Sequence, residues 1–578
     1  MKRYDNIRIN LVFVFVFLAA GLIGYRLFVL SYVKHNLYSR TAEAQRENIN
    51  NILARGNIYF QPDFIAGTNK KFLLAHVVPK DVDVSKRDYV IEQLVQVLSI
   101  DKAELAKVLD SNAPHIKVLA RNISNEQGDK IKSLKTKGVG VSYEMNRFYP
   151  AGELAANVIG FLGYNGNIRA GQYGIEGYYD KELFGNKWQT NDYINPANLA
   201  NSFSFIKKII SVGNKTPDEK NVETISRPSD IVLTIDKNIQ LTIENKLDEL
   251  VKKWEAVGGT VIVQDPNTGK ILAMADRPTF DPNNYSQSDQ YNFLNRGVQE
   301  VFEPGSSFKP ITMAIGLDLG KINPQMTYTD TGSIEIAGYK IKNFSEKIFG
   351  LQTMTQVLEK SINTGAMYVE NLVGDDNFLN YLINMGFGQK TNIDLPGEVN
   401  GDITNLYSGR KINFLTASFG QGIAVTPIQL INAYSAIANG GKLLRPYVVE
   451  KIIKDGGEEV ATKPEIVSIP ISEKTANRVK SMLVSVVDNG FDKALIKGYD
   501  IAGKTGTAQI PDGKGGYLEN EFIHDFVGFA PAFNPKFVIL IKLDKPKGIT
   551  FAADSLSPTA RDITSFLLNY YNIPPTRQ

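Results

Sequence analysis

The chain has 578 residues and a formal net charge of +3, with 64 basic and 61 acidic side chains. This near balance argues against a nucleic-acid-binding protein, and the absence of cysteine excludes disulfides and thiolate metal sites. The four histidines are scattered, so no histidine metal cluster is expected, and the length is typical of roughly two to four domains.

The first predicted element is a helix over residues 10–33, which is long and apolar enough to cross a bilayer. Basic residues before it favour a cytoplasmic N-terminus of residues 1–9. A cleaved signal peptide is the alternative, but the apolar character continues past Arg26, which favours a retained anchor. Arg26 itself is predicted to be either an interfacial residue or a contact for a membrane partner.

Residues 34–228 combine several kinds of local pattern. The beginning, 34–55, is polar and amphipathic, which is typical of a helical stalk leaving the membrane. A strand-like run follows at 71–78 and a helical one at 87–98. Residues 186–228 are polar and rich in Asn, Lys and Ser, and they are predicted to form a loop or linker.

Residues 229–578 are predicted to form one α+β domain. A strand at 229–236 precedes a long amphipathic helix, and two β-branched runs around Pro-Asn-Thr-Gly at 258–276 predict a hairpin. Helices dominate from about 306 to 440, and a last helix is expected at 557–571. Helices bounded on both sides by antiparallel strand signals are typical of an α+β fold. The returning strand signals lie at 447–453, 498–510, 525–532 and 536–544.

The stretch EPGSSFKP begins the helical part of this domain. Pro304 and Gly305 predict a turn, and a helix is expected to start at Ser306 and continue through the next proline, which a first turn tolerates. Residues three apart share a helix face, so Ser306 and Lys309 are predicted to lie side by side at a helix N-terminus. Alone, Ser-x-x-Lys is common and is explained by a turn and a helix start.

Two further short motifs follow in the same predicted domain, Ser361-Ile-Asn363 and Lys504-Thr-Gly-Thr507. The first alone is more often a helix cap, and the second alone is more often a strand that ends in a turn. Together with the Ser-x-x-Lys motif, in this order, they form the signature of the serine acyl-enzymes that recognise penicillin.

With these motifs and several longer stretches, the chain resembles a class B penicillin-binding protein, a monofunctional peptidoglycan D,D-transpeptidase. The resemblance implies a penicillin-binding transpeptidase domain at 229–578, with an antiparallel sheet flanked by helices and an all-helical lobe. It also implies a single transmembrane helix and an elongated, mixed α/β pedestal domain of the dimerisation type at 34–228. RGNIYFQ at 55–61 departs from the Asp-Arg-Asn-Gly that the family often carries there. The longer stretches are VQDPNTGKILAMADRPTFDPN, GFGQKTNIDLPGE, SFGQGIAVTPIQL, RFYPAGELAANVIGFLG and YGIEGYYDKELFG.

A serine hydroxyl needs an adjacent base to act as a nucleophile, and Lys309 is the base that this motif offers to Ser306. Lys309 must be neutral for this role, and burial together with a second cation at Lys504 lowers a lysine pKa. The resemblance implies that Ser361 shuttles a proton toward the leaving amine. It also implies that Asn363 forms a hydrogen bond with the substrate amide.

The Lys504–Thr507 segment is expected to be a strand at a sheet edge that binds the substrate. The resemblance implies that Lys504, Thr505 and Thr507 hold the terminal carboxylate of the substrate. Gly506 lacks a side chain, so a peptide could lie alongside as an added strand. The backbone N–H groups of Ser306 and Thr507 are the implied oxyanion hole.

The implied reaction is attack on the penultimate D-alanine carbonyl of a peptidoglycan stem peptide. Terminal D-alanine leaves, an acyl-serine forms at Ser306, and an amine of a neighbouring stem resolves it into a cross-link. β-Lactams are expected to acylate the same serine, and neither a metal nor a cofactor is needed. His524 is expected to be a structural or rim histidine rather than part of a Ser-His hydrolase, because no G-x-S-x-G elbow is present.

Several other functions are less consistent with the sequence. A β-lactam sensor would need a cytoplasmic effector, and a β-lactamase would usually lack the 34–228 region. Carboxypeptidase side activity stays open. Glycan polymerisation is expected from a partner, by resemblance a membrane glycosyltransferase of the SEDS family, alongside other divisome proteins. EPGSSFKP favours a division (septal) enzyme over the elongation type, with a sporulation variant as a further alternative. The protein is expected to be a single-pass protein of the plasma (inner) membrane.

Overall fold

The computed structural model describes most of the chain beyond the N-terminal segment. The predicted transmembrane helix at 10–33 (apart from Gly21), the stalk at 34–55 (apart from Arg55) and the linker at 186–228 (apart from Pro228) lie outside the described residues. Within the described part, no helix is long and apolar enough to cross a membrane. The described residues are Gly21, 55–165, 168–185, 228–336, 338–513 and 516–577.

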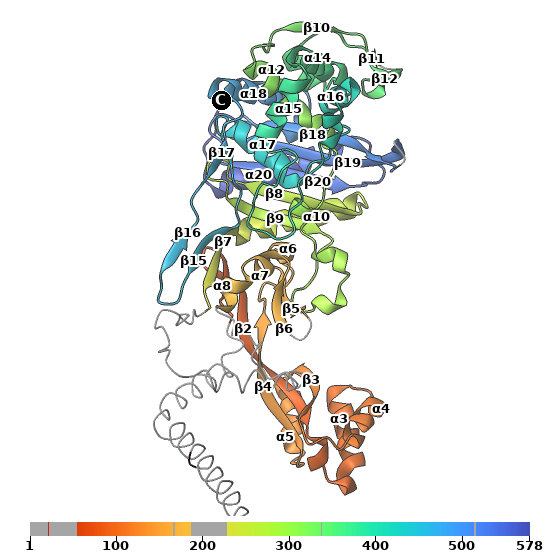
Figure 1. Cartoon of the computed structure of the whole chain (residues 1–578), viewed down its shortest axis with the longest axis vertical. Coiled ribbons are helices and arrows are strands. Elements are labelled where there is room, and N and C mark those ends of the chain that lie inside the picture. Colours follow the sequence, from red (N-terminus) through yellow and green to blue (C-terminus); the bar gives the residue numbers. More distant parts are fainter. Residues whose placement is uncertain are drawn as a thin grey trace, which may run out of the picture. The chain divides into compact units, whose positions relative to one another are not determined.

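The chain divides into two compact units. The first contains Asn69–Asn146, and the second contains Arg55–Thr68 and the described residues from Arg147 onward. The first unit, drawn in orange in Figure 1, contains most of strand β2, which pairs with β3 and β4, and helices α3 to α5 complete its core. The predicted helix at 87–98 is confirmed as α3, whose buried residues recur every three or four positions. The elements are β2 (Phe64–Val77), α3 (Arg87–Leu98), α4 (Lys102–Asp110), β3 (Lys117–Ile123), α5 (Asn125–Ser133) and β4 (Val139–Phe148).

The second unit contains a sheet that joins distant parts of the chain. Its strand β7 (Asp230–Asp236) pairs in parallel with β1 (Ile58–Gln61) and antiparallel with β15 (Val449–Ile453), which in turn pairs with β16 (Glu459–Ala461). The predicted strands at 229–236 and 447–453 therefore form, but in this sheet rather than beside the other catalytic-domain strands. Sequence patterns carry no information on such partners.

A second sheet forms the centre of this unit, with the order β18-β19-β20-β8-β9 among the described strands. All its neighbouring pairs are antiparallel, and β8 is buried along its whole length. The predicted hairpin at 258–276 is confirmed as β8 and β9. The strands are β8 (Gly258–Gln264), β9 (Ile271–Arg277), β18 (Ala502–Pro511), β19 (Tyr517–Ala530) and β20 (Phe537–Asp544).

Helices cover both faces of this sheet. Helices α10 (Lys237–Lys253) and α20 (Ser557–Tyr570) contact each other and the sheet, and a Cβ on Gly259 would lie against Leu247 of α10. Gln264 projects from the opposite face of β8, because residues an odd number apart alternate, and it bonds Asn432 of α17 (Pro427–Ala438). The α+β class expected from the sequence is confirmed.

A lobe rich in helices lies at the top of Figure 1, above the central sheet. The expectation of an all-helical lobe is wrong, because two short two-stranded antiparallel sheets, β10–β13 and β11–β12, lie between α12 and α13 in the chain. The helices are α12 (Lys309–Asp318), α13 (Met354–Glu359), α14 (Asn363–Val373), α15 (Asp375–Asn384), α16 (Lys411–Ala417) and α18 (Glu473–Asn489). The hairpin strands are β10 (Thr327–Asp330), β11 (Ser333–Ile336), β12 (Tyr339–Lys342) and β13 (Gly350–Thr353).

Two stretches that carried the resemblance before residue 229 meet in a buried ion-pair network of the second unit. Glu176 is fully buried, and its carboxylate accepts from Arg55 and, at 2.7 Å, from Arg147. Tyr149 donates its hydroxyl to the same carboxylate at 3.1 Å. Removing one partner of a buried pair leaves an uncompensated charge, so the loss of either arginine is expected to destabilise this region.

Candidate active site

The turn and helix start at EPGSSFKP are present, with one difference. Residues Gly305–Phe308 form a 3-10 turn, and the α-helix α12 begins at Lys309 rather than at Ser306. Side chains three apart eclipse each other in a 3-10 turn, so the expected pairing is kept. The Lys309 Nζ donates to the Ser306 Oγ at 3.0 Å. Lys309 is fully buried, and Ser306 is half-buried.

Two glycines allow this turn to sit against the rest of the domain. Gly305 adopts φ +55°, and its N–H donates to the carbonyl of Gly420 at 3.0 Å. Gly420 has φ +81°, and a Cβ there would lie 2.2 Å from the Gly305 carbonyl oxygen. The positive φ and this clash both require glycine at position 420. Gly422, Gly440 and Gly441 of the same domain also have positive φ.

Ser361 lies next to both lysines. The Lys309 Nζ donates to the Ser361 carbonyl at 2.6 Å and lies 3.1 Å from its Oγ, and the Lys504 Nζ lies 3.2 Å from the same Oγ. Ser361 has φ +55°, a left-handed conformation that costs free energy outside glycine and is common at functional sites. The helix-cap alternative is wrong, because Ile362 occupies the cap of α14 without a side-chain cap bond.

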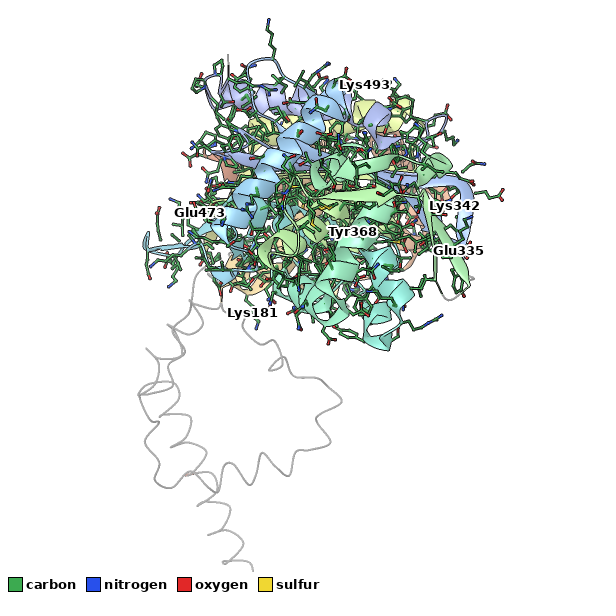
Figure 2. The ribbon with its side chains drawn as sticks, turned by 90° about the horizontal axis from the view of Figure 1, so that it is seen from above. Lys181, Glu335, Lys342, Tyr368, Glu473 and Lys493 are labelled. Atoms are coloured by element: carbon green, nitrogen blue, oxygen red, sulfur yellow. The ribbon has the colours of Figure 1, made fainter. Side chains whose placement is uncertain are left out.

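Asn363 is the first residue of α14 and is held from one side. Its Nδ2 donates to the backbone carbonyl of Lys342, which ends β12 at the edge of the lobe in Figure 2. The amide nitrogen is thereby fixed, and the Asn363 side-chain oxygen stays available as an acceptor. No sequence motif marked Lys342, because it contributes a backbone carbonyl.

A buried acid anchors the same region and was missed in the sequence. Asp330 accepts hydrogen bonds from the Thr364 hydroxyl at 2.6 Å and the Asn343 Nδ2 at 3.0 Å. The Asn343 Oδ1 in turn accepts from the Thr364 N–H at 3.1 Å. This network ties the β10–β12 segment to the first turn of α14, where Asn363 lies. In the sequence, Asp330 is marked only as a polar residue at the end of a short strand-like run, which does not predict its hydrogen bonds.

The Lys504–Thr507 segment lies on β18, an edge strand of the central sheet, as expected. The Lys504 side chain is buried, and its Nζ lies 3.1 Å from the Thr505 carbonyl. Thr505 and Thr507 are half-buried, and the Thr507 Oγ1 accepts from the Ala552 N–H at 3.0 Å. The segment therefore adds one lysine and two hydroxyls to the group formed by Ser306, Lys309 and Ser361, which is called the Ser306 cluster below.

Gly506 is required by packing inside the domain as well. A Cβ at this position would lie 2.1 Å from the Asp525 Oδ2 and 2.3 Å from the Pro304 carbonyl oxygen. The sequence attributed this glycine to the approach of a substrate strand. The contacts add an internal reason, because any larger residue would separate β18 from the turn that carries Ser306.

The two lysines have unusual electrostatic surroundings. Burial, and then the positive charge of Lys504, hold the pKa of Lys309 well below its ordinary value. Burial lowers the pKa of Lys504 to about 8, although the Asp525 carboxylate opposes this shift. Lys309 therefore favours the neutral form that a general base needs, while Lys504 remains largely cationic at neutral pH.

His524 is a buried structural residue, so the alternative of a rim position is wrong. The ring is fully buried; Nε2 donates to the Thr550 carbonyl at 3.1 Å, and Nδ1 accepts from the Ser555 hydroxyl at 2.8 Å. Burial lowers the pKa of His524 to about 4, so the ring is neutral.

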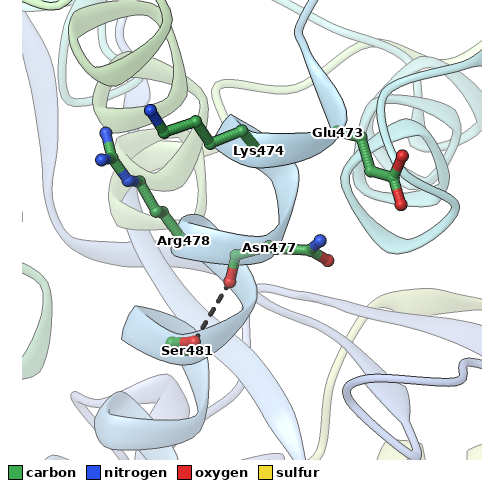
Figure 3. Close-up of a pocket in the computed structure, with 5 residues that line it drawn as sticks. All are labelled: Glu473, Lys474, Asn477, Arg478 and Ser481. Atoms are coloured by element: carbon green, nitrogen blue, oxygen red, sulfur yellow. Dashed lines mark hydrogen bonds between the residues drawn. The ribbon is translucent and has the colours of Figure 1, made fainter.

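An open depression of about 590 Å³ lies elsewhere on the same unit. Residues on one face of α18 line this depression. Figure 3 shows their side chains, with the Ser481 hydroxyl donating to the Asn477 carbonyl. None of its lining residues belongs to the three motifs, so it carries no catalytic group of the predicted set. The lining residues are Glu473, Lys474, Asn477, Arg478 and Ser481.

Comparison with known proteins places these motifs in one family. The family described as penicillin binding protein transpeptidase domain matches residues 259–565, a stretch that contains all the predicted site residues. The chain belongs to this family. The penicillin-binding protein dimerisation domain matches residues 53–201 of the same penicillin-binding protein.

Relatives of this penicillin-binding protein span nearly its full length. "Stage V sporulation protein D" of Bacillus subtilis is 34% identical over 566 residues, covering 96% of this chain and 84% of the relative. "Peptidoglycan D,D-transpeptidase FtsI" of Escherichia coli is 30% identical over 487 residues, covering 83% and 77%. Penicillin binding protein 3 of Mycobacterium tuberculosis, solved with aztreonam, aligns with a TM-score of 0.67 at 25% identity, covering 91% of this chain and 98% of that one.

Proposed function

We propose that this penicillin-binding protein is a serine D,D-transpeptidase that cross-links peptidoglycan stem peptides. The observation that carries the proposal is the contact of the Ser306 Oγ with the Nζ of the fully buried Lys309, at 3.0 Å. A buried, neutral amine beside a hydroxyl is the arrangement that activates a serine for acyl transfer. The relative of Escherichia coli named a peptidoglycan D,D-transpeptidase supports the substrate class.

In the acylation step, neutral Lys309 takes the hydroxyl proton as the Ser306 Oγ attacks the penultimate D-alanine carbonyl. The oxyanion is stabilised by the backbone N–H groups of Ser306 and Thr507. The C–N bond to the terminal D-alanine breaks, and its nitrogen receives a proton through the Ser361 hydroxyl, which lies within 3.1 Å of Lys309. The acyl-serine is then attacked by an amine of a second stem, which regenerates the serine.

Substrate binding uses the neighbouring groups. The donor peptide lies along the edge strand β18 as an added strand, with its carboxylate on Lys504, Thr505 and Thr507. Asn363 accepts from the peptide amide, since its nitrogen is already bonded to the Lys342 carbonyl. β-Lactams occupy the same place and acylate Ser306, and relatives solved with ampicillin and aztreonam support this.

In the cell, the enzyme is proposed to be a single-pass protein of the inner membrane, anchored by residues 10–33, with its catalytic domain at 229–578 outside the membrane. Its proposed role is septal synthesis with a SEDS-family glycosyltransferase and divisome proteins, supported by the similarity to FtsI. Sporulation is a second candidate, because the sporulation protein of Bacillus subtilis is 34% identical. Depletion in the host separates the two, since filamentation indicates division and defective spores indicate sporulation.

The activity is tested with the full chain in detergent, a separate glycan polymerase and lipid-linked precursor. Ser306→Ala is expected to abolish the cross-linked muropeptides that mass spectrometry detects in the wild-type digest. Ser307→Ala is the matched control, because the Ser307 hydroxyl donates to the Pro304 carbonyl at 2.9 Å and is buried away from the reaction. Cross-links that persist in Ser306→Ala would refute the proposal.

A further inference from the structure

A line of polar residues crosses the central sheet beneath the site. Gly506 on β18 is opposite Asp525 on β19, which is opposite Lys542 on β20. Residues directly opposite in antiparallel strands share a face, so these side chains lie on one face of the sheet. Lys504 lies two residues from Gly506 and is therefore the diagonal neighbour of Asp525 on that face.

Asp525 is a buried carboxylate without a hydrogen bond. It is fully buried, and neither carboxylate oxygen has a hydrogen-bond partner among the described residues. The nearby Ser307 hydroxyl donates to the Pro304 carbonyl instead, at 2.9 Å. A Cβ on Gly506 would lie 2.1 Å from the Asp525 Oδ2, so this oxygen packs against β18, the strand that carries Lys504. A buried carboxylate without hydrogen bonds is costly, so a compensating charge or function is expected.

The charges around Asp525 point to Lys504 as its partner. Lys542, on the other side, already pairs with Asp544 at 2.5 Å and lies 3.7 Å from Glu300. The Lys504 Nζ, by contrast, forms hydrogen bonds among the described residues only with neutral oxygens, those of Ser361 and Thr505.

Among the described residues, helix α17 adds a third titratable group, Tyr434, near Asp525. Burial, and then the Asp525 charge, raise the pKa of Tyr434 well above its ordinary value, so that side chain stays neutral. Its hydroxyl donates to the Ser307 carbonyl at 2.6 Å. Asp525 therefore faces two cations and one neutral phenol.

We propose that Asp525 is a positioning residue for the transpeptidase site, whose buried carboxylate keeps Lys504 cationic and directed at Ser361 and the substrate carboxylate. The inference rests on the proposed function of the Ser306 cluster. Asp525 acts through Lys504 and touches no reacting atom.

Two pKa shifts are consistent with this role. Burial raises the pKa of Asp525 to about 7, against the opposing positive charges of Lys504 and Lys542, so the carboxylate is about half ionised at pH 7 and mostly ionised above it. The same charge opposes the fall in the pKa of Lys504, which stands at about 8. Loss of the carboxylate would therefore lower the pH at which Lys504 loses its proton.

The test is the pH profile of acylation by benzylpenicillin, measured as the second-order rate constant on the full chain. Asp525→Asn is isosteric and removes the charge, and Asp525→Ser removes it with a smaller side chain. Both are expected to move the alkaline limb of the profile to lower pH by about one unit, with little change near pH 6. The matched control is Asp276→Asn, since Asp276 is a buried acid at the other end of the same sheet, with a pKa raised by burial to about 7.

An alkaline limb that stays in place in folded Asp525 variants would overturn the proposal, as would an equal shift in Asp276→Asn. If both Asp525 variants are unfolded in the absence of ligand, the carboxylate is needed for folding rather than for positioning Lys504, and the proposal is overturned. A wild-type chain that is never acylated at Ser306 would instead contradict the proposed function itself, so the two failures are distinguishable.

Discussion

The chemistry of this penicillin-binding protein depends on one buried lysine. Lys309 contacts the hydroxyls of Ser306 and Ser361 and the Ser361 carbonyl, and it faces a second cation at Lys504. An ammonium ion in this position would lack a counter-charge in its contacts, so the neutral amine is favoured. The sequence predicted both causes of this shift, burial and Lys504, because motif order identified the residues. It gave no sign of Asp525, whose position depends on the register between β18 and β19.

Replacing Lys309 with methionine is expected to slow acylation by about 10²–10⁴-fold, because the general base is lost while the buried volume is nearly kept. The rate of benzylpenicillin labelling of the full chain measures this. Lys480→Met is the matched control, since Lys480 is also buried with a pKa lowered by burial, yet it lies on α18. Equal losses in the two variants would contradict the base assignment.

The pH dependence of acylation is expected to be bell-shaped. Activity falls at acidic pH as Lys309 gains a proton, and this limb lies well below the ordinary lysine range because the pKa of Lys309 is lowered. Activity falls again as pH rises through about 8, where Lys504 loses the charge that binds the substrate carboxylate. Rate constants measured between pH 5 and pH 10 test this, and a rate that keeps rising to pH 10 would contradict the role of Lys504.

At the scale of elements, the site is assembled from three segments that are far apart in the sequence. The 3-10 turn before α12, the left-handed Ser361 before α14 and the edge strand β18 bring the three motifs together. Local patterns predicted the hairpin, the edge strand and the helices. They missed the two small two-stranded sheets in the lobe, because runs of four residues are too short for a periodic signal.

Gly506→Ala is expected to destabilise the protein by about 1–3 kcal/mol and to slow acylation, because the new Cβ would force β18 away from Pro304 and Asp525. Urea unfolding and the labelling rate measure the two effects. Gly177→Ala is the control, since the nearest atom to a Cβ there is at an ordinary 3.4 Å. A Gly506→Ala protein with wild-type stability and rate would contradict the packing reason for this glycine.

At the scale of the whole molecule, sequence segments and compact units do not coincide. The second unit takes in Arg55–Thr68 and the chain from Arg147 onward, so stretches of the predicted pedestal belong to it. Strand β7 pairs with β1, about 170 residues earlier. Composition and periodicity locate strands but cannot assign such distant partners, so the boundary at residue 229 stays a prediction.

Deleting residues 1–33 is expected to release the protein from the membrane and to leave penicillin binding intact, because every motif residue lies in the second unit. Fractionation of cells that express the full or the shortened chain, with fluorescent penicillin as the label, measures both properties. A shortened chain that still sediments with membranes would contradict the single anchor.

The central claim is that Ser306 is the residue acylated by penicillin. The most direct test is intact-mass spectrometry of the full chain after incubation with benzylpenicillin, followed by peptide mapping. A persistent adduct of one drug molecule on the Ser306 peptide is the predicted result. A folded chain without an adduct, or with an adduct on another residue, would contradict the claim, and an adduct that turns over rapidly would indicate a β-lactamase instead.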